Sequence, residues 1–290
     1  MPVAGRSATD FRPLDPSSAT TYYRVMDRVK KPQPSRQPQF GRQTVRIYPL
    51  PANIEPGDLA GGVAVVIDVL RASTTIIVAL ANGVARVIPC GLVDTARSLA
   101  AEDETGNTLT GGERGGVKIE GFDLDNSPAS YTRERVAGRS IAFTTTNGTA
   151  ALLRTQEAAR VLIGALVNRQ AIVDALRAEG RPIHLVCAGT DGCVTSEDLL
   201  GAGAIAADLA SLGNLEFADY ATEKAAGYWT DNVRPAQRIR ELRESSGGCN
   251  LVELGFDQDI VRAAELDSIA VVPEYSPLTR AITIAGGSGL

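Results

Sequence analysis

Short apolar runs alternate with helical patterns along the chain from about residue 45 onward. The segment 63–69 is almost continuously apolar, as in a strand buried on both faces, and a helical pattern over 74–81 follows it, with Ser73 as its cap. Strands separated by helices in this way predict an α/β fold with a mostly parallel or mixed sheet and helices on both faces. The same succession recurs, with further strands expected over 86–89, 140–145, 160–164, 183–188 and 269–272, and helices over 93–102, 149–155, 169–178, 195–212 and 218–244.

The overall composition is that of an ordinary globular protein, with 44% hydrophobic and 22% charged residues among 290. Apolar runs such as 63–67 are far shorter than the ~18 residues of a membrane span, so no membrane partner is expected. No apolar leader follows Met1, which favours a cytoplasmic location. The four cysteines form no CxxC pair, and the single histidine, His184, excludes a multi-histidine metal site.

The first 45 residues differ in charge from the rest of the chain. They hold eight basic and three acidic residues and six of the 15 prolines, whereas the whole chain has a net charge of −5. Such a segment has little apolar surface to offset the entropy of ordering. We therefore expect a flexible, basic, Pro-rich extension over residues 1–43 and a folded domain over residues 44–290. The basic residues are not interleaved with aromatic ones, so no nucleic-acid partner is expected.

Three predicted strand-to-helix turns are rich in polar residues. An acid, a guanidinium and three hydroxyls occupy 68–75, and hydroxyls and a glycine occupy 144–149. The third turn, 188–192, precedes Glu197 and Asp198 at a helix start, where Thr195 and Asp198 have the spacing of a capping box. Each turn offers free backbone N–H groups and the positive end of a helix dipole, which favours an anion site. Taken singly, each turn is better explained by helix capping or by an Asp-Gly turn. Three such turns in one sheet indicate that their ends converge on one cleft.

A Gly-rich, charged stretch lies between the first two turns, over 110–118 and 121–128. A long loop without secondary structure of its own is typical of a binding loop. Ser127-Pro128 has a structural explanation, as the cap and first position of a helix that ends near residue 136. Glu113 and Asp123 have no such explanation, and both are candidate site residues.

Several tempting motifs fail on closer reading. The segment 201–206 fits a dinucleotide-binding fingerprint, but it lies within a predicted helix, where its small residues favour close helix packing. The segment 111–118 lacks the Lys-Ser/Thr ending of a P-loop. His184 and Cys187 lie in the middle of a predicted strand, which favours a packed position in the core.

Five motifs together closely resemble the 2-phosphosulfolactate phosphatase family, over roughly residues 44–273. The resemblance implies a magnesium-dependent phosphatase that releases phosphate from 2-phospho-3-sulfolactate, giving 3-sulfolactate, with an α/β fold of its own class and a homo-oligomeric assembly. Asp125, where a glycine is expected, and Cys249, where a larger polar residue is expected, depart from the pattern. The motifs occur in order along the chain at 66–75 (VIDVLRASTT), 121–128 (GFDLDNSP), 144–149 (TTTNGT), 188–198 and 250–273.

The chemistry of phosphate-ester hydrolysis assigns roles to these residues. Catalysis must remove on the order of 20 kcal/mol or more of barrier, whereas a helix N-terminus contributes only ~1–2 kcal/mol. A metal and a fixed cation are therefore needed, and magnesium prefers oxygen ligands. Our hypothesis gives the metal to Asp68 with one or two of Glu113, Glu197 and Asp198. The predicted catalytic residues are Asp68, Arg71, Ser73 and Thr74, and the predicted substrate-binding residues are Arg114, Lys118, Asn126, Ser127, Thr145, Thr146, Asn147, Gly148, Thr149 and Thr190.

Some alternatives stay open at the level of sequence. The nucleophile is either water activated by the metal or Asp68 itself, as a transient phosphate acceptor. The substrate is a small anionic phosphate ester, which includes esters other than 2-phospho-3-sulfolactate. A non-catalytic phosphate or nucleotide binder is the alternative of a different class, but carboxylates repel a phosphate unless a cation lies between them.

Overall fold

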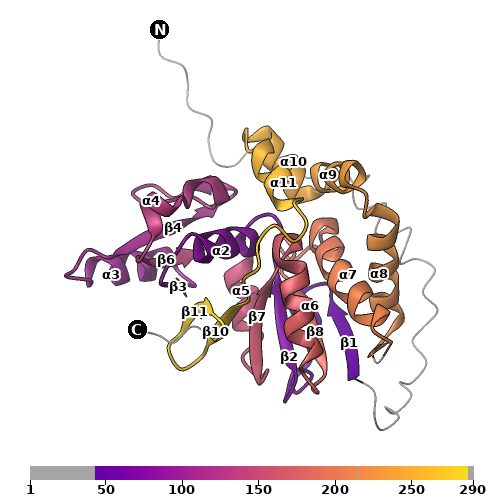
Figure 1. Ribbon diagram of the computed structural model, residues 1–290. Helices are drawn as coiled ribbons and strands as arrows, with labels where there is room; N and C mark the ends of the chain where they lie inside the picture. Colours follow the sequence, from indigo (N-terminus) through magenta and orange to yellow (C-terminus); the bar gives the residue numbers. More distant parts are fainter. Residues whose placement is uncertain (1–42, 214, 287–290) are drawn as a thin grey trace. The chain divides into compact units, whose positions relative to one another are not determined.

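The computed structural model describes residues 43–213 and 215–286, so all but the last residue of the predicted extension over 1–43 lies outside the described residues. The predicted α/β class is confirmed: helices alternate with the strands of one mixed sheet (Figure 1). The strands are β1 (Gln43–Tyr48), β2 (Val63–Ile67), β3 (Arg86–Pro89), β4 (Thr108–Arg114), β5 (Val117–Lys118), β6 (Ser140–Thr144), β7 (Arg160–Gly164), β8 (Ile183–Cys187), β9 (Leu215–Phe217), β10 (Pro273–Ser276) and β11 (Ala281–Ile284).

Ten α-helices are present in the described part of the chain, together with 3-10 turns at Pro51–Asn53, Pro128–Ser130 and Leu166–Asn168. The helices are α2 (Ala72–Ala81), α3 (Val93–Ala101), α4 (Arg133–Val136), α5 (Gly148–Leu153), α6 (Arg169–Arg177), α7 (Ser196–Ser211), α8 (Tyr220–Asn232), α9 (Pro235–Glu244), α10 (Ser246–Glu253) and α11 (Asp257–Ala263). Among the described residues, no helix has the length and apolar character that crossing a membrane requires.

The sheet consists of two groups of parallel strands joined by an antiparallel hairpin, with the short β5 antiparallel to β4 at one edge. Its order is β5-β4-β6-β3-β11-β10-β7-β2-β8-β1-β9. Strands β4, β6 and β3 are parallel to one another, as are β7, β2, β8, β1 and β9. The pairings β3–β11, β11–β10 and β10–β7 are all antiparallel, so the two groups run in opposite directions. Figure 1 shows α2 between the two groups.

Strand β2 is buried on both faces, as its continuous apolar run predicts. Val63, Val65 and Ile67 pack in a cluster with residues of α6–α11, whereas Ala64 and Val66 pack in a second cluster with residues of α2 and α5. The second cluster also contains residues of β3, β6, β7 and β11, so the sheet curls around α2. This curl brings the ends of strands from the two groups close together.

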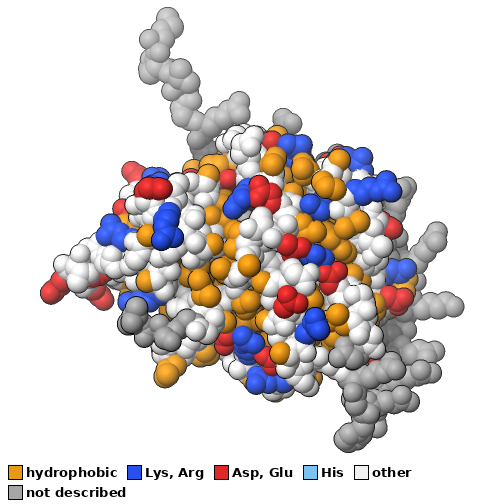
Figure 2. Space-filling view, in the orientation of Figure 1, with side chains coloured by type: hydrophobic (Ala, Val, Ile, Leu, Met, Phe, Trp, Pro, Cys, Tyr) orange, Lys and Arg blue, Asp and Glu red, His pale blue; other side chains and the backbone are white. Residues whose placement is uncertain are grey.

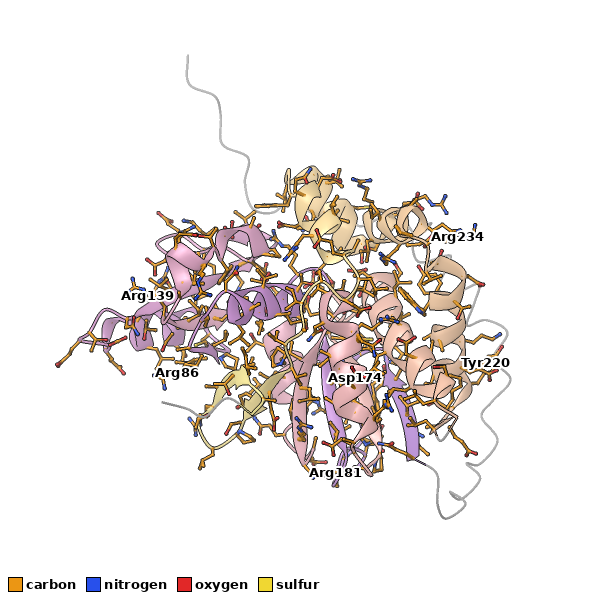
Figure 3. All side chains as sticks on the ribbon, viewed as in Figure 1. Arg86, Arg139, Asp174, Arg181, Tyr220 and Arg234 are labelled. Atoms are coloured by element: carbon orange, nitrogen blue, oxygen red, sulfur yellow. The ribbon has the colours of Figure 1, made fainter. Side chains whose placement is uncertain are left out.

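Charged side chains are intermingled on the outside of this core. On the face drawn in Figure 2, basic and acidic side chains alternate without a large patch of either sign. Among the side chains labelled in Figure 3, Asp174 extends from α6, whereas Arg86 lies on the side of the β3–β6 group. The net charge of the chain is therefore not gathered over this face.

Predictions for two single residues and for one helix pair are confirmed. Cys187 is completely buried. His184 is buried in β8 with its Nδ1 atom 3.4 Å from the Tyr48 hydroxyl, and burial lowers its pKa to about 4. In α7, a side chain at Gly203 would collide with the backbone carbonyl of Ala225 in α8, so the small residues do allow close helix packing.

Four predicted elements are wrong in kind or extent. The Gly-rich segment 110–118 is not a loop but the hairpin β4–β5. Glycine suits position 112, where φ is +142° and where a side chain would collide with the Thr144 carbonyl. The helix expected up to residue 136 is a 3-10 turn followed by the short α4. Pro235 at the first position of α9 divides 218–244 into two helices. The segment 269–272 is no strand: Ile269 packs beside the turn Leu166–Asn168, and β10–β11 follow it.

Candidate active site

The turn between β2 and α2 is held in shape by its own side chains. Asp68 Oδ1 accepts a hydrogen bond from the Ala72 N–H at 3.1 Å, and Ser73 Oγ accepts one from the Asp68 N–H at 3.0 Å. The Thr74 hydroxyl donates to the Val69 carbonyl at 2.8 Å. The helix begins at Ala72, so Ser73 lies inside it and is not its cap. The two hydroxyls therefore shape the turn, and a catalytic role for them stays a prediction.

The three polar turns lie together, as predicted. Asp198, in the first turn of α7, accepts the Val69 N–H on Oδ1 at 2.8 Å and the Gly189 N–H on Oδ2 at 2.9 Å. The Asp191 N–H donates to Asn147 Oδ1 at 3.2 Å, which ties the third turn to the second. A side chain at Gly148 would lie 2.8 Å from Asp68 Oδ2, so the second turn also approaches the first. Asp198 thus spans two turns, and the capping box expected between Thr195 and Asp198 is wrong because Thr195 makes no capping hydrogen bond.

Glu113 connects the hairpin β4–β5 to the second turn. Its Oε2 atom accepts the Gly116 N–H at 2.7 Å, and its Oε1 atom accepts the Thr146 N–H at 2.9 Å. The neighbouring Arg114 donates to Thr144 Oγ1 at 2.9 Å, which fixes a guanidinium beside the end of β6. Lys118 is exposed on β5, opposite Glu113 in the hairpin register. The hairpin therefore carries two cations next to the turns.

Asp123 lies in the loop that follows this hairpin and contacts β4. Its Oδ2 atom accepts both the N–H and the hydroxyl of Thr110 at 2.8 Å. The expectation that Asp123 has no structural role is therefore wrong. Asp125, where the family pattern has a glycine, accepts the Ser127 N–H at 2.9 Å and so forms a local turn.

Arg71 is buried between segments that are remote in the sequence. Its Nη1 atom donates to Asp259 Oδ2 in α11 at 2.7 Å, and its Nη2 atom donates to the Gly116 carbonyl at 2.8 Å. The guanidinium carbon lies 4.5 Å from the centre of the Phe256 ring. The other oxygen of Asp259 accepts the Ser127 hydroxyl at 2.7 Å. Sequence reasoning did not assign a role to Asp259, and its only signal was its place in the last family motif.

Glu197 lies one residue before Asp198 and reaches a further C-terminal element. Its Oε1 atom accepts the Gly247 N–H at the start of α10 at 3.2 Å. Its Oε2 atom is buried and has no hydrogen-bond partner among the described residues. A side chain at residue 247 would collide with Glu197 Oε1, so the glycine leaves room for the carboxylate in this position. Glu197 therefore presents one free oxygen inside the protein.

The remaining predicted site residues lie in the same turns and loops. Asn126 and Thr145 are buried, and Asn126 Oδ1 and Thr145 Oγ1 both lack a partner among the described residues. The Thr145 N–H donates to Thr149 Oγ1 at 3.4 Å. Thr190 pairs with Cys193 through its backbone. The structure thus brings the predicted residues into one region, and their roles toward a substrate stay predictions.

All buried carboxylates of the described residues belong to this region: Asp68, Glu113, Glu197, Asp198 and Asp259. Burial and repulsion from Asp198 hold the pKa of Asp68 well above its usual range. Burial, with repulsion from Asp68, raises the pKa of Glu197 to about 7, and burial with repulsion from Glu197 raises the pKa of Asp198 to about 7. Such clustering of acids with raised pKa is typical of a functional site and costs stability unless protons or a cation compensate it.

The sequence model of 2-phosphosulpholactate phosphatase matches residues 48–277. The chain belongs to this family. Among its relatives are three proteins described as probable 2-phosphosulfolactate phosphatases. The protein from Symbiobacterium thermophilum is 41% identical over 77% of this chain and 96% of its own length. The protein from Deinococcus radiodurans is 40% identical over 74% of this chain and 88% of its own length. The protein from Synechococcus is 40% identical over 79% of this chain and 95% of its own length.

The 2-phosphosulfolactate phosphatase family is named for a phosphoric monoester hydrolase, and the chain is accordingly an enzyme of that class. The matched residues 48–277 include the whole network, from Asp68 in the first turn to Asp259 in α11. The region described above is thus the candidate active site of a family phosphatase.

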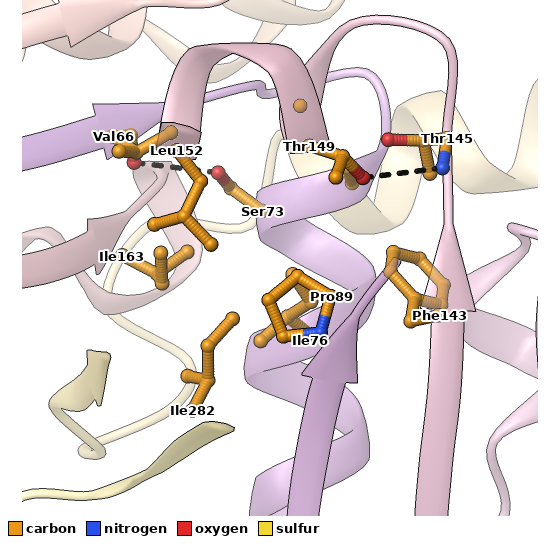
Figure 4. Close-up of a pocket in the computed structure, with 12 residues that line it drawn as sticks. Val66, Ser73, Ile76, Pro89, Phe143, Thr145, Thr149, Leu152, Ile163 and Ile282 are labelled. Atoms are coloured by element: carbon orange, nitrogen blue, oxygen red, sulfur yellow. Dashed lines mark hydrogen bonds between the residues drawn. The ribbon is translucent and has the colours of Figure 1, made fainter. Parts of the chain in front are cut away.

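A cavity lies directly beneath the first two turns (Figure 4). Its volume is about 20 Å³, and side chains such as Val66, Ile76 and Phe143 line it, with Ser73 and Thr145 at its polar end. This space is enough for about one water molecule. The substrate of a family phosphatase is larger, so this cavity is too small to hold it.

The carboxylates differ in what they offer a cation. Within residues 43–213 and 215–286, no three His, Cys, Asp or Glu side chains form a ready-made metal site. Both oxygens of Asp198 and of Glu113 accept backbone N–H groups, so these acids hold the turns in place. Glu197 Oε2 has no partner, and no hydrogen bond to Asp68 Oδ2 is formed within the described residues. These two oxygens could hold a cation that needs few protein ligands.

Proposed function

We propose that this protein is a magnesium-dependent phosphatase that hydrolyses 2-phospho-3-sulfolactate to 3-sulfolactate and phosphate. The family supplies the substrate, since the relatives with up to 41% identity are described by that activity. The observation that carries the proposal is the gathering of every buried carboxylate of the described residues around one turn that also holds a buried guanidinium. Cytoplasmic location and homo-oligomeric assembly stay predictions.

The donor set supports magnesium over other metals. Mg²⁺ usually binds one or two carboxylates and completes its coordination with water and substrate phosphate oxygens. We assign Asp68 and Glu197 to this role, because each has an oxygen without a protein donor. When bound, the ion would neutralise negative charge on the phosphoryl group and lower the pKa of a coordinated water. Glu113 and Asp198, assigned to the metal in the sequence hypothesis, fit a supporting role better.

Cationic groups and amides of this chain would bind the rest of the substrate. Arg71 would contact phosphoryl oxygens with the N–H groups that Asp259 and Gly116 leave free, since a guanidinium has five donors and two are used. Backbone N–H groups of 145–149 would contribute further donors at the start of α5. Arg114 and Lys118, on the hairpin beside these turns, are suited to the sulfonate and carboxylate groups.

The test is phosphate release by the purified full chain, with and without chelator. The substrates are 2-phospho-3-sulfolactate, 2-phospholactate, which lacks the sulfonate, and 3-phosphoglycerate. We expect hydrolysis of 2-phospho-3-sulfolactate that a chelator stops and added Mg²⁺ restores. Faster hydrolysis of 2-phospholactate would contradict the assigned substrate. Saturable phosphate binding without any turnover would contradict the enzymatic role.

A further inference from the structure

The ion pair between Arg71 and Asp259 is buried and crosses 188 residues of sequence. Its side chains are only 2% and 4% exposed, and the Nη1–Oδ2 distance is 2.7 Å. Removing two charges from water costs free energy that their attraction barely returns, so such pairs are weak evidence for a stabilising role. A function in placing one of the two charges explains the pair better.

Every contact of the Arg71 guanidinium restricts its orientation. Asp259 and the Gly116 carbonyl accept from the two terminal nitrogens, and the Phe256 ring covers one face at 4.5 Å. Phe256 and Asp259 both belong to the start of α11, Phe256 as the residue that precedes its first turn. The C-terminal helix thus sets the plane of a cation that belongs to the β2–α2 turn.

Both oxygens of Asp259 already accept hydrogen bonds from protein groups. Oδ2 accepts from Arg71, and Oδ1 accepts from the Ser127 hydroxyl at 2.7 Å. Ser127 belongs to the loop that follows the hairpin β4–β5, so one carboxylate fixes both the loop and the guanidinium. Asp259 therefore acts on the groups that would touch the substrate and does not itself touch the substrate.

We propose that Asp259 is a positioning residue, which orients Arg71 toward the phosphoryl oxygens and locks the Ser127 loop against it. The inference rests on the proposed function and deepens it, since it places part of the phosphate site on α11. It predicts that the charge of Asp259 matters for activity more than for folding.

The test compares two substitutions on the same helix. Asp259→Asn keeps the shape but offers one acceptor to two donors, and we expect kcat/KM to fall about 10–100-fold, as for other partners that orient a site residue. Asp257→Asn is the matched control, because Asp257 forms an exposed ion pair with Arg243, with side chains 43% and 40% exposed. It should leave kcat/KM unchanged. An Asp259→Asn enzyme with wild-type kcat/KM would overturn the proposal.

A second measurement separates positioning from a general structural role. If Asp259 acts through Arg71, adding Asp259→Asn to an Arg71→Gln enzyme should cause no further loss of kcat/KM, because the group that it orients is already gone. Losses that multiply would show an independent role and overturn the proposal. The unfolding midpoint of each variant, measured in parallel, shows whether the assay temperature lies within its folded range.

Binding of inorganic phosphate, measured by calorimetry with Mg²⁺ present, keeps this proposal distinct from the proposed function. A wild-type protein that binds phosphate but does not hydrolyse 2-phospho-3-sulfolactate would refute the proposed function alone. In that case, weaker phosphate binding by Asp259→Asn, but not by Asp257→Asn, would still support the positioning role. Equal binding by both variants would overturn that role. A wild-type protein that neither binds phosphate nor hydrolyses the ester would overturn both.

Discussion

Two polar regions lie at opposite ends of the strand group β4–β6–β3. The candidate site adjoins the carboxyl end of β6, whereas an open hollow of about 350 Å³ lies at the other end, where Arg86, Thr108 and Ser140 begin their strands. Both regions contain acids with several hydrogen bonds. In the hollow, the hydroxyls of Thr105 and Thr108 lower the pKa of Asp103 to about 2.

The difference between the regions is burial and the proximity of like charges. Asp68 also accepts a hydrogen bond, yet desolvation and Asp198 hold its pKa well above the usual range. The larger space therefore holds the carboxylate that is stable in its charged form, because a solvated carboxylate needs no cation. In the candidate site, buried carboxylates repel one another, and this repulsion decreases only when a proton or a metal ion binds.

The largest expected effect is that of a substitution at Asp68, in the centre of the candidate site. Asp68→Asn should lower kcat by at least about 10³-fold, equivalent to ~4 kcal/mol of activation free energy, because it removes a cation ligand, or the nucleophile itself. Steady-state phosphate release measures it. Asp174→Asn, on the exposed side of α6 (Figure 3), serves as the control. Activity of Asp68→Asn near that of the control would refute the site.

Glu197→Gln should separate metal affinity from stability. Replacing the carboxylate that has a free oxygen should weaken Mg²⁺ binding about tenfold or more, ~1.4 kcal/mol or more. It should also stabilise the metal-free protein at pH 8, because one of the repelling charges is gone. Calorimetric titration with Mg²⁺ and thermal unfolding in chelator measure the two effects. Unchanged Mg²⁺ affinity would remove Glu197 from the metal site.

The free energy of unfolding should depend on pH because of the same buried carboxylates. The pKa values of Glu197 and Asp198 are about 7 in the folded protein, above their ordinary values of 4.5 and 3.8. Their contribution to stability is therefore present at low pH and is lost as the pH rises toward and past 7. In chelator, the difference in stability between the wild type and Glu197→Gln should shift in favour of the variant between pH 5 and 8. Added Mg²⁺ should stabilise the wild type more at pH 8 than at pH 5. A stabilisation by Mg²⁺ that shrinks as the pH rises would contradict this account.

The smallest effect is expected in the open hollow. Asp103→Asn removes a carboxylate that binds Thr105 and Thr108. Because this carboxylate is solvated and far along the strands from the site, kcat/KM and Mg²⁺ affinity should stay at wild-type values. The same assays measure it. A marked loss of activity would show that the two regions are coupled, and the contrast between them would fail.

The strands and turns that depend on neighbouring residues could be predicted from the sequence. Strand β2 and the polar turn that begins with Asp68 could be predicted from neighbouring residues, because a continuous apolar run and the polar residues that end it are local features. The capping box of Thr195 and Asp198 has the correct spacing, yet it does not form, because the Val69 and Gly189 N–H groups compete for the same carboxylate.

Contacts that cross the chain could not be predicted in this way. Asp259 lies 188 residues from Arg71, and Gly247 lies 50 residues from Glu197. Neither pairing leaves a periodic signal, and an acid in the first turn of a helix is explained equally well by the helix dipole. The strand content of 108–118 was also hidden, because glycines that permit close strand contact resemble the glycines of a loop.

The hairpin β10–β11 has a consequence for how the molecule is made. It fills the middle of the sheet between β3 and β7, yet it is encoded after every other described strand. During synthesis, the two halves of the sheet must wait with their inner edges unpaired until residues 273–284 leave the ribosome. Those edges are then open to wrong partners, and loss of this short segment would leave the two strand groups without the strands that pair them, so that only the packing around α2 would hold them together.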